Sequence, residues 1–211
     1  MKKTIGIIGG MGPLATADLF RKIVTMTDAK CDQEHPRVLI DSNTNIPDRT
    51  AAILTGGENP LPQLAASART LERAGADVLM MPCNTAHYFY DGVCAATKLP
   101  VLHMLRLTAE EIDRRKIKTV GLLATDGTIR TGIYERLFGE HGVAVVKPDA
   151  AGQKQIMALI YDGVKAGNAA FDTTPVRAVL DAMLALGVEA FVLGCTELPI
   201  VFAQCELPYP V

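Results

Sequence analysis

Short runs of apolar, β-branched residues alternate along this chain with longer segments in which apolar residues recur at helical spacing. In the first half this pattern predicts strands at 4–8, 38–40, 78–81 and 100–104, and helices at 13–27, 60–74, from Thr85 onward and 108–115. In the second half it predicts strands at 119–123, 143–146 and 190–193, and helices at 129–141, 153–165 and 175–186. Continuous apolar strands that alternate with helices are typical of an α/β fold with parallel sheets covered on both faces and right-handed crossovers.

The two halves of the chain contain similar segments at similar spacing. Residues 5–8 are similar to 120–123, and residues 74–85 are similar to 185–196. Gly6 precedes Cys83 by nearly the same number of positions as Gly121 precedes Cys195. The repeat predicts two pseudo-symmetric lobes, 1–105 and 106–211, each a mostly parallel sheet flanked by helices. The alternative is a chance likeness between two βαβ units.

The repeat is incomplete at its end. Residues 98–101 lead into a predicted helix, whereas the matching residues 206–211 are the last of the sequence. We therefore expect that one final helix of the second lobe is missing from this chain. The alternative is a naturally short variant.

Composition and charge narrow the class of protein. The 211 residues are 49% hydrophobic and 21% charged, which suits a packed core, and the formal net charge is −2. Dispersed charges of this balance give no electrostatic reason for a nucleic-acid partner or an anionic membrane surface. No apolar run approaches the ~18 residues that a membrane span needs. Five cysteines without CxxC spacing predict free thiols in a cytoplasmic protein, and no zinc site.

Two of the cysteines have matching surroundings. Cys83 and Cys195 each follow a predicted buried strand and precede a predicted helix. The carboxyl ends of parallel strands border the crevice where open α/β sheets bind ligands. A helix N-terminus there would lower the pKa of a thiol and hold a carboxylate, and Asn84, Thr85 and Thr196 could cap those helices. The alternative is two core cysteines, and Cys31, Cys94 and Cys205 are interpreted as packing or surface residues.

A pair of thiols on opposite sides of a substrate suits one reaction type. To invert a carbon centre, a base removes a proton from one face and an acid returns one to the other face. Thiol and thiolate exchange these roles when the other enantiomer is the substrate. The sequence thus predicts Cys83 and Cys195 as an acid and base pair for racemisation.

Several motifs then resemble the aspartate/glutamate racemase family. The two cysteine motifs are PCNTAH at 82–87 and GCTELP at 194–199. The glycine-rich opening GIIGGMGP at 6–13 is similar to the aspartate racemase branch, as are NIPDRT at 45–50 and YDGVKAG at 161–167. Glutamate racemases carry Asp-Ser-Gly after the first strand, where this chain has Gly9, Gly10 and Met11. The resemblance spans nearly the whole chain.

The resemblance implies a fold, an activity and a set of site residues. It implies an active site in the cleft between the lobes, with no pyridoxal phosphate, other cofactor or metal. It implies that Cys83 and Cys195 interconvert the enantiomers of aspartate, glutamate or both, and that the protein is a homodimer. Arg49 and Lys165 would bind the distal carboxylate, with Asn84, Thr85 and Thr196 around the α-carboxylate. The full expected substrate-binding set is Met11, Arg49, Asn84, Thr85, Ala86, Thr125, Lys165, Thr196 and Glu197.

The residues by themselves leave some of these roles open. Arg49 could be an ordinary surface arginine, and Lys165 could interact with a helix C-terminus. Thr125 and Thr128 follow the first strand of the second half and could line the cleft. His87 could orient or shuttle a proton, or simply cap or pack. Glu197 could help to set the protonation of Cys195, or could favour a helix N-terminus.

Three other functions compete with acidic-amino-acid racemisation. Gly10, Gly12 and Ala15 fit a loose G-x-G-x-x-A fingerprint after a first strand, with Asp41 at the end of the second strand, which would suit a dinucleotide. A two-lobed scaffold could also be a non-catalytic amino-acid binder. Related folds could use similar cysteines for isomerisation or decarboxylation of a dicarboxylate, or for hydantoin racemisation.

Overall fold

The computed structural model describes residues 2–168 and 170–211. The chain forms two compact units, the first ending at Met104 and the second running from Leu105 to Val211. Each unit is an α/β fold around its own three-stranded parallel sheet. No helix in the described residues is long and apolar enough to cross a membrane.

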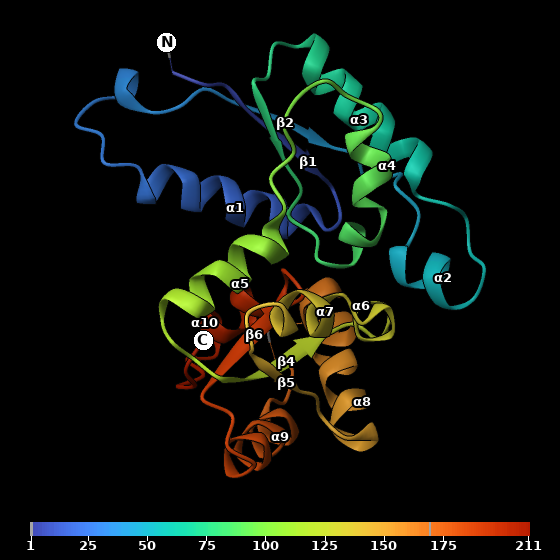
Figure 1. Ribbon diagram of the computed structural model, residues 1–211, viewed down its shortest axis with the longest axis vertical. Coiled ribbons are helices and arrows are strands. Elements are labelled where there is room, and N and C mark those ends of the chain that lie inside the picture. Colours follow the sequence, from blue (N-terminus) through green and yellow to red (C-terminus); the bar gives the residue numbers. More distant parts are fainter. Residues whose placement is uncertain (1, 169) are drawn as a thin grey trace. The chain divides into compact units, whose positions relative to one another are not determined.

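The first unit is built around a central strand that is buried on both faces. Its strands β1 (Ile5–Gly9), β2 (Val38–Ser42) and β3 (Val78–Met80) are parallel and lie in the order β2-β1-β3. Helix α1 (Pro13–Met26) packs on one face of this sheet, and α3 (Leu61–Arg73) packs on the other (Figure 1). The central position of β1 explains why Ile7 and Ile8 are fully buried, as its apolar run predicts.

The connections of the first unit contain shorter elements. A 3-10 turn at Asp32–Glu34 precedes β2, and α2 (Arg49–Leu54) follows it. A 3-10 helix at Thr85–Phe89 leads into α4 (Tyr90–Cys94). The predicted strand at 100–104 is wrong in extent, because only one isolated bridge joins Val101 to Leu79. The chain leaves the sheet at once, since α5 (Met104–Arg114) begins three residues later.

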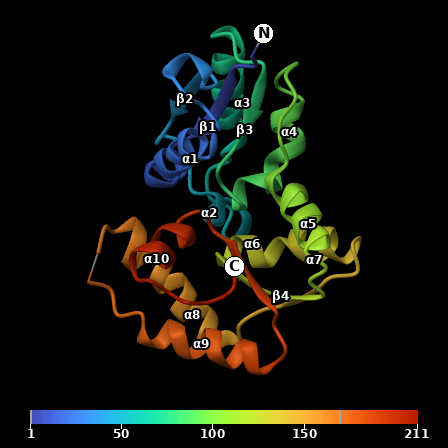
Figure 2. The same ribbon diagram turned by 90° about the vertical axis from the view of Figure 1, so that its left-hand side faces the viewer.

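The second unit repeats this topology. Strands β4 (Thr119–Ala124), β5 (Ala144–Val146) and β6 (Ala190–Gly194) are parallel in the order β5-β4-β6, and they are labelled in Figure 1. The helices of this unit are labelled in Figure 2. Helices flank this sheet and follow its strand ends. They are α6 (Asp126–Thr131), α7 (Ile133–Gly139), α8 (Ala150–Ala158), α9 (Thr174–Ala185) and α10 (Leu198–Gln204).

Two predicted helices of the second unit are interrupted. The helix expected at 129–141 is two helices, because Gly132 adopts a left-handed conformation with φ 61° between α6 and α7. The helix expected at 153–165 changes from α-helix to a π-helical segment at Leu159–Lys165. Apolar spacing does not distinguish these hydrogen-bond patterns, so the sequence pattern could not predict either change.

Matching contacts support the internal repeat. Asp77 accepts a hydrogen bond from the Thr4 backbone N–H at 2.7 Å, and its counterpart Glu189 accepts one from Thr119 at 2.8 Å. The Leu79 N–H of β3 donates to the Pro100 carbonyl at 2.9 Å, and the Phe191 N–H of β6 donates to that of Pro210 at 2.7 Å. The segments that were similar in sequence therefore make equivalent hydrogen bonds within their own units.

Gly121 and Gly6 are the equivalent glycines of the two central strands, and both are needed for close packing. A Cβ atom on Gly121 would lie 2.6 Å from the ring of Phe191, its partner on β6. We expect Gly121→Ala to lower the free energy of unfolding by about 1–3 kcal/mol, because the buried ring must move. Gly139→Ala is the control, since open space surrounds its position in α7 and helix propensity predicts a slight gain. Urea unfolding of both variants measures the difference, and equal stabilities would contradict the prediction.

Candidate active site

Cys83 lies in the loop that leaves the carboxyl end of β3. Its backbone N–H donates to the Met81 carbonyl at 2.8 Å, so this residue forms part of a tight turn rather than a helix start. The side chain is 6% exposed, and Asn84, Thr85 and Ala86 beside it are also buried. The 3-10 helix begins at Thr85, and Asn84 at its N-cap position makes no side-chain capping bond. The expected cap at this position is therefore wrong.

His87 fixes the backbone of the Cys83 loop. Its Nδ1 lies 2.8 Å from the Cys83 carbonyl oxygen, and the Met104 N–H donates to its Nε2 at 3.2 Å. These partners assign the proton to Nδ1 in a neutral ring. Burial lowers the pKa of His87 to about 4. Both nitrogens are thus used in structural hydrogen bonds, which favours an orienting and packing role over proton shuttling.

The depressed pKa of His87 makes stability depend on pH. Between pH 6.5 and about 4 the unfolded chain binds a proton that the folded protein does not, so the free energy of unfolding decreases as the pH falls through this window. The contribution from His87 should amount to about 2 kcal/mol between pH 7 and pH 5. Urea unfolding at both values tests this against His87→Gln, an amide that keeps a donor and an acceptor without titrating. The same pH dependence in both proteins would contradict the assignment.

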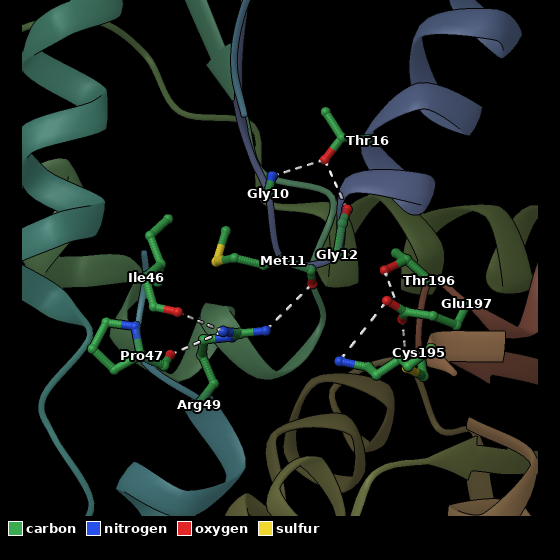
Figure 3. A network of polar contacts seen from close by, with 11 residues as sticks. Gly10, Met11, Gly12, Thr16, Ile46, Pro47, Arg49, Cys195, Thr196 and Glu197 are labelled. Carbon is green, nitrogen blue, oxygen red and sulfur yellow. Dashed lines mark hydrogen bonds and ion pairs between the residues drawn. The ribbon is translucent and has the colours of Figure 1, made fainter. Parts of the chain in front are cut away.

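Arg49 is buried, which excludes the surface-arginine alternative. Asp48 is the N-cap of α2 and accepts a hydrogen bond from the Ala51 N–H at 2.7 Å, so Arg49 is the first helical residue. Its Nη1 donates to the carbonyl oxygens of Ile46 and Pro47 at 3.2 and 2.9 Å (Figure 3). Its Nη2 makes only a long contact of 3.5 Å to the Met11 carbonyl, and its Nε is buried without a hydrogen-bond partner in the described residues.

The hydroxyl group of Thr16 makes two hydrogen bonds to the backbone of the glycine-rich loop after β1. The Gly10 N–H donates to Thr16 Oγ1 at 2.9 Å, and this hydroxyl donates to the Gly12 carbonyl at 2.9 Å (Figure 3). A pyrophosphate-binding loop offers its backbone N–H groups to the ligand. Since the Gly10 N–H is already used within the loop, this geometry disfavours the dinucleotide alternative.

Cys195 lies directly after β6, in the position that matches Cys83. Its Sγ donates to Glu197 Oε2 at 2.9 Å, and both side chains are buried. Burial and the adjacent Glu197 carboxylate raise the pKa of Cys195 well above its usual value. The expectation that a helix N-terminus increases the thiolate fraction is therefore wrong for Cys195. Helix α10 begins only at Leu198, with Glu197 rather than Thr196 at its N-cap.

Lys165 points toward the same carboxylate. It is the last residue of the π-helical segment, and its Nζ lies 4.0 Å from Glu197 Oε1 and 5.0 Å from the centre of the Tyr161 ring. This geometry gives its amine a role beyond that of a helix-end charge. Lys165, Glu197 and Cys195 thus form a polar chain within the second unit, of which Glu197 and Cys195 are labelled in Figure 3.

Two tyrosines near the polar side chains of Lys165, Glu197 and Cys195 were not predicted as site residues. Tyr134 on α7 is buried and close enough to Cys195 for an electrostatic interaction between their ionised forms. Burial raises the pKa of the Tyr134 phenol. Tyr161 contacts the Lys165 amine through its ring. Both residues sit at apolar positions of helical patterns, so the sequence offered no signal that separates them from core aromatics.

Thr125 and Thr128 belong to the start of α6. Thr125 is the N-cap, and its hydroxyl accepts a hydrogen bond from the Thr128 N–H at 3.3 Å. The two hydroxyl oxygens lie 3.2 Å apart, and both side chains are buried. This arrangement demonstrates a capping role, and a role in substrate binding stays a prediction.

The strand ends explain which predicted residues come together within each unit. Met11, Arg49 and Cys83 follow β1, β2 and β3, whose carboxyl ends meet at one edge of a parallel sheet. Thr125 and Cys195 follow β4 and β6 in the same way, and Lys165 joins Cys195 through Glu197. Over residues 2–168 and 170–211, no three His, Cys, Asp or Glu side chains are grouped as metal ligands.

Comparisons with known proteins agree with this geometry. A family model described as Asp/Glu/Hydantoin racemase matches residues 8–211. Aspartate racemase from Picrophilus torridus is 33% identical, with a TM-score of 0.90 over 99% of this chain and 87% of that one. An aspartate racemase homologue from Pyrococcus horikoshii is 31% identical, with a TM-score of 0.74 over 94% and 87%. The broad specificity amino-acid racemase RacX of Bacillus subtilis is 26% identical over 98% of this chain and 91% of its own length.

Fold and comparisons together define an isomerase with the two-lobed racemase fold. The chain belongs to the Asp/Glu/hydantoin racemase family, whose members work without pyridoxal phosphate. The predicted family and fold class are confirmed.

Proposed function

We propose that this protein racemises an acidic amino acid, aspartate, glutamate or both, by proton transfer between Cys83 and Cys195 without a cofactor. The observation that carries the proposal is the equivalence of the two thiols. Each is buried and lies close after the third strand of its unit, Cys83 in the loop that leaves β3 and Cys195 directly after β6, in sheets of matching strand order. The carboxyl ends of parallel strands border the ligand sites of α/β folds, so this placement favours a role in chemistry over a role in packing.

The proposed reaction balances its protons within the two side chains. The thiolate of one cysteine removes the proton from the α-carbon, and the C–H electron pair stays on the substrate as a carbanion. The thiol of the other cysteine then donates its proton to the opposite face. The product is the other enantiomer, and the protonation states of the two cysteines are exchanged. The mechanism requires one sulfur on each face of the α-carbon.

Arg49 supports a substrate with a second carboxylate. Its Nε and Nη2 form one edge of the guanidinium group, and among residues 2–168 and 170–211 the hydrogen-bond contact of that edge is the long one to Met11. A carboxylate bound there would make two parallel, charge-assisted hydrogen bonds. Lys165 would supply a second positive charge by exchanging its contact with Glu197 for the substrate.

The remaining predicted residues would orient the α-amino acid. We propose that Asn84, Thr85 and Thr196 donate to the α-carboxylate, with Met11, Ala86 and Thr125 as surrounding contacts. Two relatives are an aspartate racemase and a broad specificity amino-acid racemase by name, which supports an amino-acid substrate. Homodimer formation stays a prediction that sedimentation velocity would test.

Exchange of the α-proton tests the proposal directly. The protein is incubated in D₂O with L-aspartate or L-glutamate and no added cofactor, while NMR follows the α-proton and chiral chromatography follows the D-enantiomer. We expect deuterium incorporation together with inversion for at least one of them. L-Asparagine is the matched control, because its neutral amide cannot form the carboxylate pair with Arg49. A folded protein that exchanges neither acidic amino acid would overturn the proposal in favour of a dicarboxylate or hydantoin substrate.

A further inference from the structure

Among the differences between the two cysteine motifs, one places a charged side chain in contact with a proposed catalytic thiol. Cys83-Asn84-Thr85 in the first unit corresponds to Cys195-Thr196-Glu197 in the second. A neutral hydroxyl residue thus stands two positions after one thiol, and a carboxylate stands two positions after the other. The Cys195 Sγ lies 2.9 Å from Glu197 Oε2, in a contact that is buried on both sides.

We propose that Glu197 is a positioning residue that makes the two thiols unequal, because it holds Cys195 in the protonated form and orients its S–H bond in the free enzyme. Cys195 is then the resting proton donor. This inference rests on the proposed two-cysteine racemisation. It also changes the role expected for Glu197, which acts through Cys195 rather than on the substrate.

The groups around Cys195 support this polarity. A carboxylate accepts a hydrogen bond from a thiol but repels a thiolate, so Glu197 stabilises the protonated form. Tyr134 on α7 is near enough to Cys195 for an electrostatic interaction, and its buried phenol stays neutral because burial raises its pKa. The positive charge of Lys165, on the π-helical segment, has the opposite effect and favours the thiolate of Cys195. Its amine lies 4.0 Å from the other carboxylate oxygen of Glu197, Oε1.

Lys165 also links this polarity to substrate binding. In the free protein its amine partly compensates the charge of Glu197 at 4.0 Å. If the distal carboxylate of the substrate draws the amine away, Glu197 acts on Cys195 with less compensation. The thiol is then held more firmly as the proton donor at the moment when the substrate is bound.

Alkylation as a function of pH measures the protonation of each thiol without any turnover. The protein is treated with iodoacetamide, a small neutral reagent, and fragment mass spectra report Cys195 and Cys83 separately in the same sample. We expect Glu197→Gln to speed alkylation of Cys195 by at least ~10-fold at pH 8. This corresponds to a decrease of about one pH unit in the midpoint of the curve of Cys195 alkylation rate against pH. Alkylation of Cys83 should stay unchanged.

Two further variants keep the test decisive. Lys165→Met should slow the alkylation of Cys195 by about twofold or more, the opposite direction, because the compensating charge is lost. Glu140→Gln makes the same charge change at an exposed position of the same unit and should have no effect. An unchanged Cys195 rate in folded Glu197→Gln, or the same change in Glu140→Gln, would overturn the role of Glu197.

The readout also separates this inference from the proposed function. Alkylation reports the thiol whether or not the protein turns over a substrate. A lack of α-proton exchange would overturn the proposed racemisation while leaving the alkylation result as expected. If the protein racemises its substrate but the pH midpoint of Cys195 alkylation is the same in Glu197→Gln, only the present inference is overturned.

Discussion

Replacement of either Cys83 or Cys195 by serine is expected to reduce racemisation by at least ~10³-fold in both directions. Each turnover uses one residue as base and the other as acid, and general acid–base groups contribute roughly 10²–10⁴ each. A serine hydroxyl has a far higher pKa than a thiol, so it does not supply the anion near neutral pH. Chiral chromatography of aspartate or glutamate reaction mixtures, started from each enantiomer, measures the loss.

Matched controls for this prediction exist in each unit. Cys94→Ser and Cys205→Ser make the same atomic change at half-buried cysteines of the first and second unit. Both should keep nearly full activity, since neither residue directly follows a strand of its sheet. A Cys83→Ser or Cys195→Ser protein that racemises as fast as these controls would contradict the two-thiol mechanism.

Arg49→Lys is expected to lower kcat/KM for a dicarboxylic amino acid by about 30-fold to 5,000-fold. The substitution keeps the charge but removes the Nε and Nη2 edge, and truncation of a buried charged pair costs about 2–5 kcal/mol. It also leaves the carbonyl groups of Ile46 and Pro47 with a single amine in place of the guanidinium donors. Initial rates at varied substrate concentration measure the effect.

The control for Arg49 is Arg69→Lys on α3, an exposed arginine of the same unit. Its kcat/KM should match that of the unaltered protein. If Arg49→Lys were equally active, the guanidinium group would have only a structural role, and the distal carboxylate would have to be bound elsewhere. Urea unfolding of both variants separates a loss of binding from a loss of stability.

Most of the fold could be predicted from local patterns, and the reason is physical. Parallel strands buried on both faces must be continuously apolar, so β1, β4 and β6 stand out in any window of the sequence. The internal repeat carries the same information twice, and this places Cys83 and Cys195 at equivalent strand ends. The interruptions at Gly132 and at the π-helical segment were missed, because the helical spacing of apolar residues continues through both.

The sequence by itself determined the α/β class, the repeat, the family and the two cysteine positions, since each depends on residues that are near in the chain or on motifs matched as strings. Only the tertiary structure decided how those residues behave. It buries Arg49 against the Ile46, Pro47 and Met11 carbonyls, and it brings Lys165 from 32 positions away to within 4.0 Å of Glu197. The pKa of Cys195 is raised rather than lowered because the thiol is buried and lies beside a carboxylate. Neither the burial of a side chain nor the distance between two side-chain atoms can be calculated from positions along the sequence.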